Sequence, residues 1–473
     1  MLCPQFRPLT GGYERAAERL SIALAARDHA VTVITERRDP TWAAHEDLHG
    51  VQVRRLWCVY RRGMHAASSL FSFGVWLLLH GRSFAVWHVH QYGAHATLAV
   101  LLGKLLQRPV VLKLTSSGIH QGVDAALQGL RLSGLHRWAH RRVAACIAVS
   151  EETVHEARAF GIPSQRIHAI SNGVDSAGLS PATVEWRQQA RRQRAVADGF
   201  VAIAVGRLAG EKNPIGLLHA WASAWPRLPA GSQLIWIGDG PLRAEVAACI
   251  DQLGLGHTVR LAGHSDDVPA WLAAADVFVL SSHNEGMANT LLEAMACGLP
   301  SVATAVSGTT QLLARSGAGI VVPVGDMEAL AAALVELARD SDARARMGTR
   351  ARAVIEAEYS IEHVVGKIEE LYAQIIRTGA GHDTVASVDG GAAVPLSGGG
   401  RAGEAIPLAG RRAGPARLHG ARVVRAGYAG STGIDARSRH RHPSFALATP
   451  SSGSLAACAM VVRAHLCAPG TRQ

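Results

Sequence analysis

The sequence has no apolar run long enough to cross a membrane and no recognisable secretory leader. Its longest near candidate, Val75-Trp-Leu-Leu-Leu79, falls far short of the roughly 20 residues that a bilayer-spanning helix needs. Met1-Leu-Cys-Pro4 leads directly into a turn, where a signal peptide would place a basic and then an apolar segment. We therefore expect a cytoplasmic protein.

The seven cysteines form no Cys-x-x-Cys pair, and most lie in apolar runs, so we expect reduced, buried thiols. His88, His90 and His95 invite a metal interpretation, and strand alternation would put the first two on one face. No cysteine or nearby acid joins them, which favours core or cleft histidines over ligands. No Asp-x-Asp motif is found that would hold a divalent ion on a diphosphate. We expect neither a metal nor another cofactor.

The net charge of +11 is concentrated near the C-terminus. Residues 380–473 hold 11 arginines, no lysine and 4 acidic residues, a net +7, so the basic excess does not indicate a core that binds nucleic acid. Gly, Ala, Arg, Ser and Pro dominate this segment without a period of 2 or 3.6. We expect residues 379–473 to be a disordered, low-complexity tail. A shifted reading frame in a GC-rich gene would leave the same bias.

The rest of the chain alternates short apolar strands with helical patterns, in two successive runs. The alternation fills residues 1–178 and restarts at Phe200 within residues 179–358. Such alternation predicts an α/β protein with two Rossmann-like domains that face each other across a cleft. Residues 359–378 add one amphipathic helix with one face expected to be buried.

Glu285 and Glu293 flank seven residues where an apolar strand meets a helix. A helix N-terminus has unpaired N–H groups that suit a phosphate, and two carboxylates can accept hydrogen bonds from sugar hydroxyls. This combination indicates a nucleotide-sugar pocket. Thr290-x-x-Glu293 equally fits a capping box, in which the glutamate only closes the helix N-terminus.

Two glycine-containing loops carry further candidates. Gly206, Arg207 and Lys212 lie between a strand and a helix, where a guanidinium fork and an ammonium fit a diphosphate clamp better than incidental loop charges. Gly11 and Gly12 would let the backbone approach a phosphate, although an ordinary tight turn explains them equally well.

Two turns at strand ends add to this set. Gly238-Asp-Gly-Pro241 is typical of a plain turn. His264 follows another strand end and could line a base or ribose pocket.

These motifs occur in one order and closely resemble the family 4 retaining glycosyltransferases of the GT-B fold, over about residues 1–377. The quoted segments are Gly11-Gly12, Asn172-Gly-Val174, Gly206 to Asn213, Gly238 to Pro241 and Glu285 to Glu293. The resemblance implies metal-independent transfer of a hexose from a nucleotide sugar with retention. It places the acceptor in domain 1–178, the donor in domain 179–358, and helix 359–378 back on the first domain.

The same resemblance assigns roles to residues. Arg207 and Lys212 would hold the diphosphate, Glu293 the ribose, and Glu285 the donor sugar hydroxyls. The remaining donor contacts would come from the backbone of Gly286, Met287, Ala288 and Asn289, and from Gly11 and Gly12 across the cleft.

Three departures from the family pattern stand out. A His-Gly pair is missing where the chain reads Lys113-Leu-Thr-Ser-Ser-Gly118, so Lys113, Thr115, Ser116 or His120 would have to take the histidine's place. The usual Arg-Gly-His turn is Arg27-Asp28-His29, and Asp tolerates the left-handed conformation. Only Met1 to Cys3 stand where the first strand belongs, which suggests a start upstream.

By family analogy the acceptor is a glycan or lipid-linked glycan of a cell-surface polysaccharide. A lipid-linked acceptor would bring the protein to the inner face of the membrane as a peripheral protein, and no nucleic acid partner is expected. Two alternatives stay open: a nucleotide-sugar epimerase of similar fold, and a non-catalytic nucleotide-sugar-binding subunit, which the missing histidine would suit.

Overall fold

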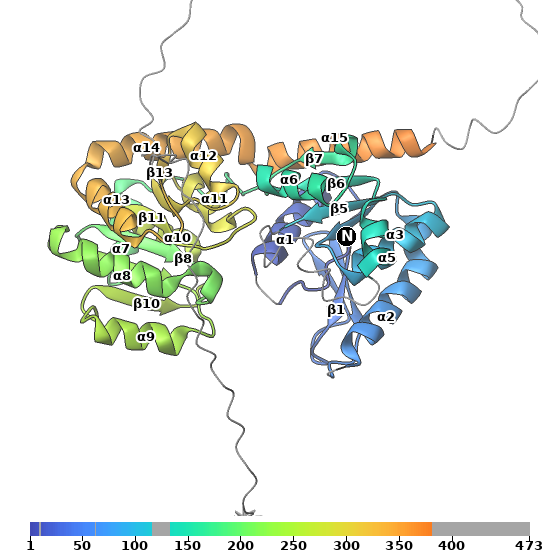
Figure 1. Cartoon of the computed structure of the whole chain (residues 1–473), viewed down its shortest axis with the longest axis horizontal. Coiled ribbons are helices and arrows are strands. Elements are labelled where there is room, and N and C mark those ends of the chain that lie inside the picture. The colour runs from blue at the N-terminus through green and yellow to red at the C-terminus, as the bar shows by residue number, and fades with distance from the viewer. Residues whose placement is uncertain (9–10, 62, 116–132, 381–473) are drawn as a thin grey trace, which may run out of the picture. The chain divides into compact units, whose positions relative to one another are not determined.

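The computed structural model describes residues 1–8, 11–61, 63–115 and 133–380. These residues form two α/β lobes, each with a largely parallel sheet between layers of helices (Figure 1). The α/β prediction is confirmed. The expected tail lies outside the described residues, apart from its first two positions, which end the last helix.

The first lobe contains two short sheets that meet at Leu2. Its strands are β1 (Thr32–Arg37), β2 (His45–Leu48), β3 (Val51–Trp57), β4 (Trp87–His90), β5 (Val110–Leu114), β6 (Ala145–Ala148) and β7 (Ile167–Ala169). The strand orders are β1-β3-β2 and β4-β5-β6-β7, and only the pair β2–β3 is antiparallel. Leu2 forms parallel bridges with Ile34 of β1 and Val89 of β4. The shortened first strand therefore keeps its place between them.

Helices cover both faces of the layer that these two sheets form. They are α1 (Gly12–Ala25), α2 (His65–His80), α3 (Ala94–Leu106), α5 (Ser133–His140) and α6 (Glu151–Ala159), with short 3-10 turns at Gly81–Ser83 and Ser164–Arg166. Helices α2, α3, α5 and α6 share one apolar cluster with the sheet, and α1 contributes to a second cluster on the opposite face. Asp28 adopts a φ of 65°, which confirms the expected left-handed turn.

The second lobe is built on six parallel strands. They are β8 (Val201–Val205), β9 (Gln233–Ile237), β10 (Val259–Gly263), β11 (Val277–Leu280), β12 (Ser301–Thr304) and β13 (Gly319–Val322). Their order is β10-β9-β8-β11-β12-β13. The chain thus winds outward from β8 in one direction and from β11 in the other, so the topology reverses between these two strands.

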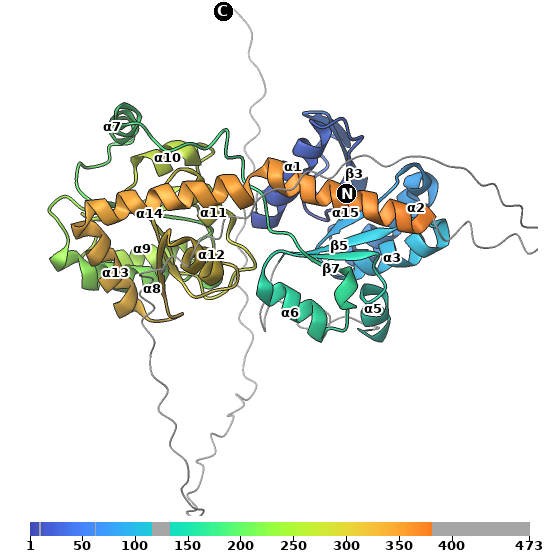
Figure 2. The ribbon, with the colours of Figure 1, turned by 90° about the horizontal axis from the view of Figure 1, so that it is seen from above.

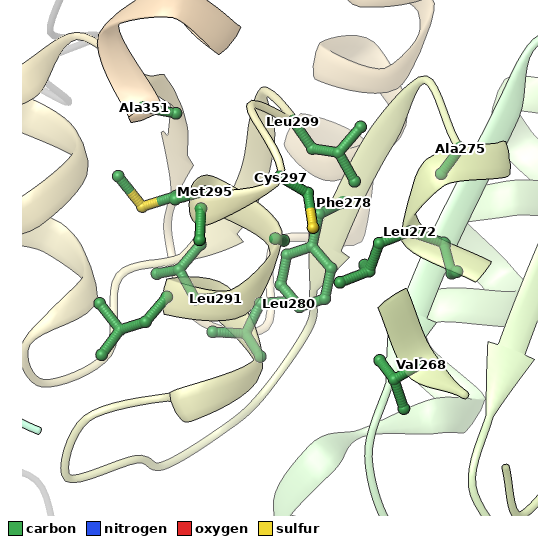
Figure 3. Close-up of a cluster of buried hydrophobic side chains, with 14 of the residues drawn as sticks. Val268, Leu272, Ala275, Phe278, Leu280, Leu291, Met295, Cys297, Leu299 and Ala351 are labelled. Atoms are coloured by element: carbon green, nitrogen blue, oxygen red, sulfur yellow. The ribbon is translucent and has the colours of Figure 1, made fainter. Parts of the chain in front are cut away.

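The helices of the second lobe form two layers. They are α7 (Val184–Gln193), α8 (Pro214–Ala224), α9 (Arg243–Gln252), α10 (Val268–Ala274), α11 (Asn289–Ala296), α12 (Thr309–Ser316), α13 (Met327–Arg339) and α14 (Ser341–Val354), with 3-10 turns at Gly210–Lys212 and Trp225–Arg227. Helices α8, α9 and α13 pack on one face of the sheet. On the other face, Phe278 and Leu280 of β11 pack among side chains of α10 and α11, including Leu272 and Leu291 (Figure 3).

A final helix, α15 (Ile361–Ala380), follows a π-helical turn at Ile355–Tyr359 and leaves the second lobe. Where it leaves, Val174 pairs with Ser360: the Val174 N–H donates to Tyr359 O at 2.9 Å and the Ile361 N–H donates to Val174 O at 2.8 Å. Helix α15 then packs beside α1 of the first lobe (Figure 2). Its buried positions, among them Val365 and Ile368, belong to the same apolar cluster as α1 and β1.

Candidate active site

The loops that follow β8 and β11 begin at the point where the topology of the second sheet reverses. In an open parallel sheet the loops at such a point diverge and leave a crevice at the carboxyl ends of the strands, which is where ligands bind. The first loop carries Gly206 to Asn213 and the second carries Ser281 to Ala288. The strand order therefore brings together two motifs that lie far apart in the sequence.

Lys212 and Glu285 meet between these two loops. The Lys212 Nζ lies 2.5 Å from Oε1 of Glu285, and the Ser282 hydroxyl donates to the same oxygen at 2.8 Å. The Ser281 hydroxyl donates to the backbone carbonyl of Lys212 at 2.9 Å, so the loops are also joined through the backbone. The predicted diphosphate cation and the predicted sugar-facing carboxylate are thus neighbours.

Arg207 lies on the first loop but is largely exposed. Its guanidinium is 3.9 Å from Glu211, a spacing that binds the side chain only weakly. The turn after β9 lies against the loop that carries Arg207. A Cβ on Gly238 would stand 2.1 Å from the carbonyl oxygen of Gly206. The close approach of these two backbones therefore requires glycine at position 238.

Helix α11 begins without a capping side chain. Ala288 is its N-cap residue and has no polar side chain, so the Thr290–Glu293 capping box does not form. Asn289, the first helical residue, instead donates to the carbonyl of Gly12 at 2.5 Å and accepts from the Asn172 amide at 2.9 Å. These bonds set the start of α1 beside the start of α11.

Glu293 is buried one turn further along α11, where it forms an ion pair with Arg19 of α1. Both residues line a cavity of about 1030 Å³. Arg7 and Arg15 from the first lobe line it too, and His264 from the second lobe lies at its edge, 3.3 Å from Asp266. The cavity offers carboxylate acceptors and guanidinium donors, which suits a ribose joined to phosphates.

Among the residues expected to face the acceptor, Lys113 is buried near the end of β5, and burial lowers its pKa to about 8. The buried rings of His88 and His90 stack 4.5 Å apart, as alternation predicts, and burial holds the pKa of both well below the usual value. His88 Nδ1 lies 2.5 Å from the hydroxyl of Tyr372 on α15.

The structure says less about the other residues expected to face the acceptor, Thr115, Ser116 and His120. Thr115 Oγ1 is buried and has no hydrogen-bond partner within the described ranges. Ser116 and His120 lie outside them.

The three histidines considered as metal ligands do not converge, because His95 Nε2 pairs with the Ser69 hydroxyl at 2.8 Å. Within the described residues, only Glu36, Cys58 and His65 bring three possible ligand atoms within 4.8 Å of one another. An Asp-x-Asp sequence does occur, at Asp340-Ser-Asp342, but it begins α14, where Asp340 caps the Ala343 N–H. It lies on a helix start and not at a strand end of the site.

Two family models match this chain. Residues 187–354 match the family described as glycosyl transferases group 1. Residues 11–173 match the glycosyl transferase 4-like domain, and together the matches take in more than half of the sequence. The chain belongs to the group 1 glycosyltransferases. Each model corresponds to one lobe.

Two relatives of this glycosyltransferase carry names that point to different products. It is 25% identical over 293 residues to the N-acetyl-alpha-D-glucosaminyl L-malate synthase of Bacillus anthracis, covering 61% of this chain and 74% of that protein. It is 33% identical over 177 residues to the lipopolysaccharide core biosynthesis glycosyltransferase LpsE of Rhizobium meliloti, covering 37% of this chain and 51% of that one.

Solved structures confirm the GT-B fold. The Anabaena protein HepE in complex with UDP superposes with a TM-score of 0.65 at 19% identity, covering 79% of this chain and 98% of HepE. In the described part of the glycosyltransferase, no helix combines the length and apolar character needed to span a bilayer.

The sequence did not indicate Arg19, Arg15 or Tyr372 as parts of the site. Arg15 and Arg19 lie four residues apart on α1, so they share one face of the helix that Gly12 begins. That spacing is a usable signal once Gly11 and Gly12 are assigned to the cleft. Tyr372 gives no such signal, because an aromatic residue in an amphipathic helix usually belongs to the core.

Proposed function

We propose that this protein is a retaining, metal-independent hexosyltransferase that uses a nucleotide-sugar donor and a glycan or lipid-linked glycan acceptor. The observation that carries the proposal is the position of the Lys212–Glu285 pair at the reversal point of the sheet, beside the uncapped start of α11. A cation and a helix N-terminus suit a diphosphate, and the carboxylate suits sugar hydroxyls.

These groups fit a reaction in which the acceptor attacks the sugar on the same face that the diphosphate leaves. The bond between the anomeric carbon and the diphosphate oxygen breaks, an oxocarbenium-like sugar forms, and the acceptor oxygen attacks from the side that the diphosphate leaves. Lys212, Arg207 and the start of α11 stabilise the negative charge that develops on the diphosphate. The departing phosphate oxygen takes the acceptor proton, so the site needs no separate base.

The cavity lined by Glu293, Arg19 and His264 would hold the nucleoside part of the donor. The relatives support a role in making cell-surface glycans, since one is named for lipopolysaccharide core synthesis. HepE, which shares the fold, was solved with UDP. A uridine nucleotide is therefore the first donor class to test.

The decisive experiment incubates the full chain with a panel of UDP-, GDP- and ADP-sugars and measures released nucleotide with and without glycan acceptors. We expect release to depend on acceptor and to disappear in Glu285→Gln. Conversion of the donor into an isomer without any acceptor would replace the proposal with an epimerase. Donor binding without turnover across all acceptors would replace it with a binding subunit.

A further inference from the structure

One segment of the first lobe has a strongly one-sided charge. Residues 48–150 contain 12 Lys and Arg residues and a single acid, Asp124, which lies outside the described residues. Outside the tail, then, the positive charge is not spread evenly: it gathers in the segment that forms α2, α3 and α5. Acidic residues elsewhere before the tail offset much of this charge, so the tail still carries most of the chain's net charge.

The same segment exposes large apolar side chains. Helix α2 buries Phe73 and Leu77 against the lobe, yet its outer face is apolar as well. Phe71 and Leu79, on that outer face, are 68% and 73% exposed, and Val75 and Leu78 lie between them at helical spacing. A helix that is apolar on both sides needs a partner for the outer one.

Helices α3 and α5 extend this apolar strip. Helix α3 packs beside α2, and α5 packs beside α3 (Figure 1). Leu101 and Leu105 are exposed on α3, and Leu135 and Trp138 are exposed on α5. The three neighbouring helices thus carry an outward apolar surface, which we call the α2–α5 face.

Cations lie within and around the α2–α5 face. Lys104 Nζ lies 4.6 Å from the centroid of the Trp138 ring, and the Arg142 guanidinium lies 4.5 Å from it. Arg82 follows α2 directly and is exposed, and Arg108 follows α3 with its guanidinium donating to the Arg82 carbonyl at 2.8 Å. None of these four cations has an acidic neighbour on α2, α3 or α5, because those helices contain no Asp or Glu.

We propose that the α2–α5 face binds the surface of an anionic lipid bilayer. Apolar side chains on a helix that lies in the interface plane enter the acyl boundary, while Lys and Arg stems reach back to the lipid headgroups. Each such cation near an anionic surface adds roughly a factor of five in partitioning. Trp side chains are enriched in the headgroup region, so the exposed Trp138 indole also fits a bilayer surface.

A second copy of the chain fits the α2–α5 face less well. A two-fold interface places the same patch on both subunits, so the cations of one copy, Lys104, Arg82 and Arg142, would face a patch that carries the same cations and no acid from α2, α3 or α5. Like charges brought together in that way repel. An anionic bilayer supplies the missing negative charge.

This inference deepens the proposed function, since a membrane-bound first lobe would meet a lipid-linked acceptor at the bilayer. It does not depend on transfer, because binding to vesicles is measured without donor or acceptor. A chain that binds vesicles but transfers no sugar would contradict the proposed function alone. A chain that transfers sugar to soluble acceptors but ignores vesicles would contradict this inference alone.

The test is co-sedimentation of the full chain with vesicles of phosphatidylcholine, with and without phosphatidylglycerol. We expect binding to the anionic vesicles and its decline with salt. The variant with Phe71→Ser and Leu79→Ser should lose roughly tenfold or more in partitioning. The variant with Lys104→Gln and Arg142→Gln should lose binding mainly on anionic vesicles.

Matched controls come from the second lobe. Val184→Ser with Val324→Ser removes two exposed apolar side chains, and Arg192→Gln with Arg346→Gln removes two exposed cations. Both controls should bind vesicles as the unchanged chain does, and all four variants should melt normally because the altered side chains are exposed. Equal binding by the α2–α5 variants and the controls would overturn the inference. Self-association through this face without vesicle binding would overturn it too.

Discussion

Arg19 of α1 and Glu293 of α11 form an ion pair although 274 residues separate them in the chain. The Glu293 side chain is almost fully buried and Arg19 is partly so. The carboxylate assigned to the ribose is therefore held in place by the first lobe, and not by the helix cap that its sequence position suggested. This relationship gives the first prediction.

Arg19→Ala and Glu293→Gln should each lower the free energy of unfolding by about 2 kcal/mol, because each leaves a partly buried partner unsatisfied. The double variant should lose little more than either single change, since the two effects share one interaction. Urea unfolding of all four proteins measures the coupling. Both single changes should also weaken UDP binding by calorimetry, because both side chains line the proposed nucleoside cavity. Additive losses of stability would show that the pair is not coupled.

Glu285→Gln should abolish transfer while the fold persists. The amide keeps the shape of the side chain but removes the charge that pairs with Lys212 and the acceptor strength offered to sugar hydroxyls. We expect kcat to fall by roughly a hundred-fold or more. Circular dichroism and turnover are compared with Glu245→Gln, an exposed glutamate on α9. Near-normal turnover in Glu285→Gln would remove this loop from the donor site.

Arg207→Ala and Lys212→Ala should each reduce turnover by roughly a hundred-fold, because each removes positive charge from the departing diphosphate. The proposed mechanism also predicts that EDTA leaves the rate unchanged. Initial rates with and without chelator test this point. A rate lost in EDTA and restored by magnesium or manganese would contradict the metal-independent mechanism.

Lys113→Met should stabilise the protein at neutral pH. Burial lowers the pKa of Lys113 from 10.5 to about 8, so the unfolded chain binds the Lys113 proton more tightly than the folded protein does. Below pH 8 the buried charged lysine therefore lowers the free energy of unfolding by its full amount. The cost is roughly 3 kcal/mol at about 1.4 kcal/mol per pKa unit, and it disappears as pH rises from 8 to 10.5.

The gain in melting temperature over the unchanged chain should therefore be large at pH 7 and small at pH 10. Lys367→Met, an exposed lysine on α15, should show no gain at either pH. Lost transfer alongside the gain would assign Lys113 to the acceptor site, and unchanged transfer would leave it a core residue only.

A chain ending at Ala380 should fold and transfer sugar as well as the full chain, whereas a chain ending at Ser360 should fail. The longer cut keeps α15, whose buried side chains include Val365, Ile368 and Leu371. The shorter cut exposes the apolar surface of α1 and the sheet beneath it. Expression, thermal melting and turnover of both chains give the answer, and equal damage would show that the segment after Ala380 is structural.

Most of the fold follows from the hydrophobic pattern, because buried parallel strands such as β8 (Val-Ala-Ile-Ala-Val) and β9 (Gln-Leu-Ile-Trp-Ile) are short, nearly continuous apolar runs. The elements that the sequence does not reveal are those without such a pattern. Strand β2 has mostly exposed side chains on an antiparallel edge, and α7 is dominated by Arg and Gln, so neither shows a clear apolar period. Tertiary contacts stabilise α7, because its Arg187 and Arg191 form ion pairs with Asp276.

Some contacts of the candidate site could also be predicted from the sequence, and others could not. Lys212 and Glu285 could be assigned to one site because each follows a strand, and parallel strands end at a common edge. The link between Asn289, Gly12 and Asn172 could not, because it joins residues from both lobes and depends on how the chain crosses between them. The Arg19 partner of Glu293 is hidden for the same reason.

The crossing at Val174 and Ser360 has a consequence for how such enzymes diversify. The second lobe is one uninterrupted stretch of chain between these two residues, so a single internal segment of the gene encodes it. The first lobe needs both flanks, because α15 completes its apolar cluster. Recombination can thus exchange the second lobe as one continuous segment, whereas replacing the first lobe requires both flanking segments to come from the same parent.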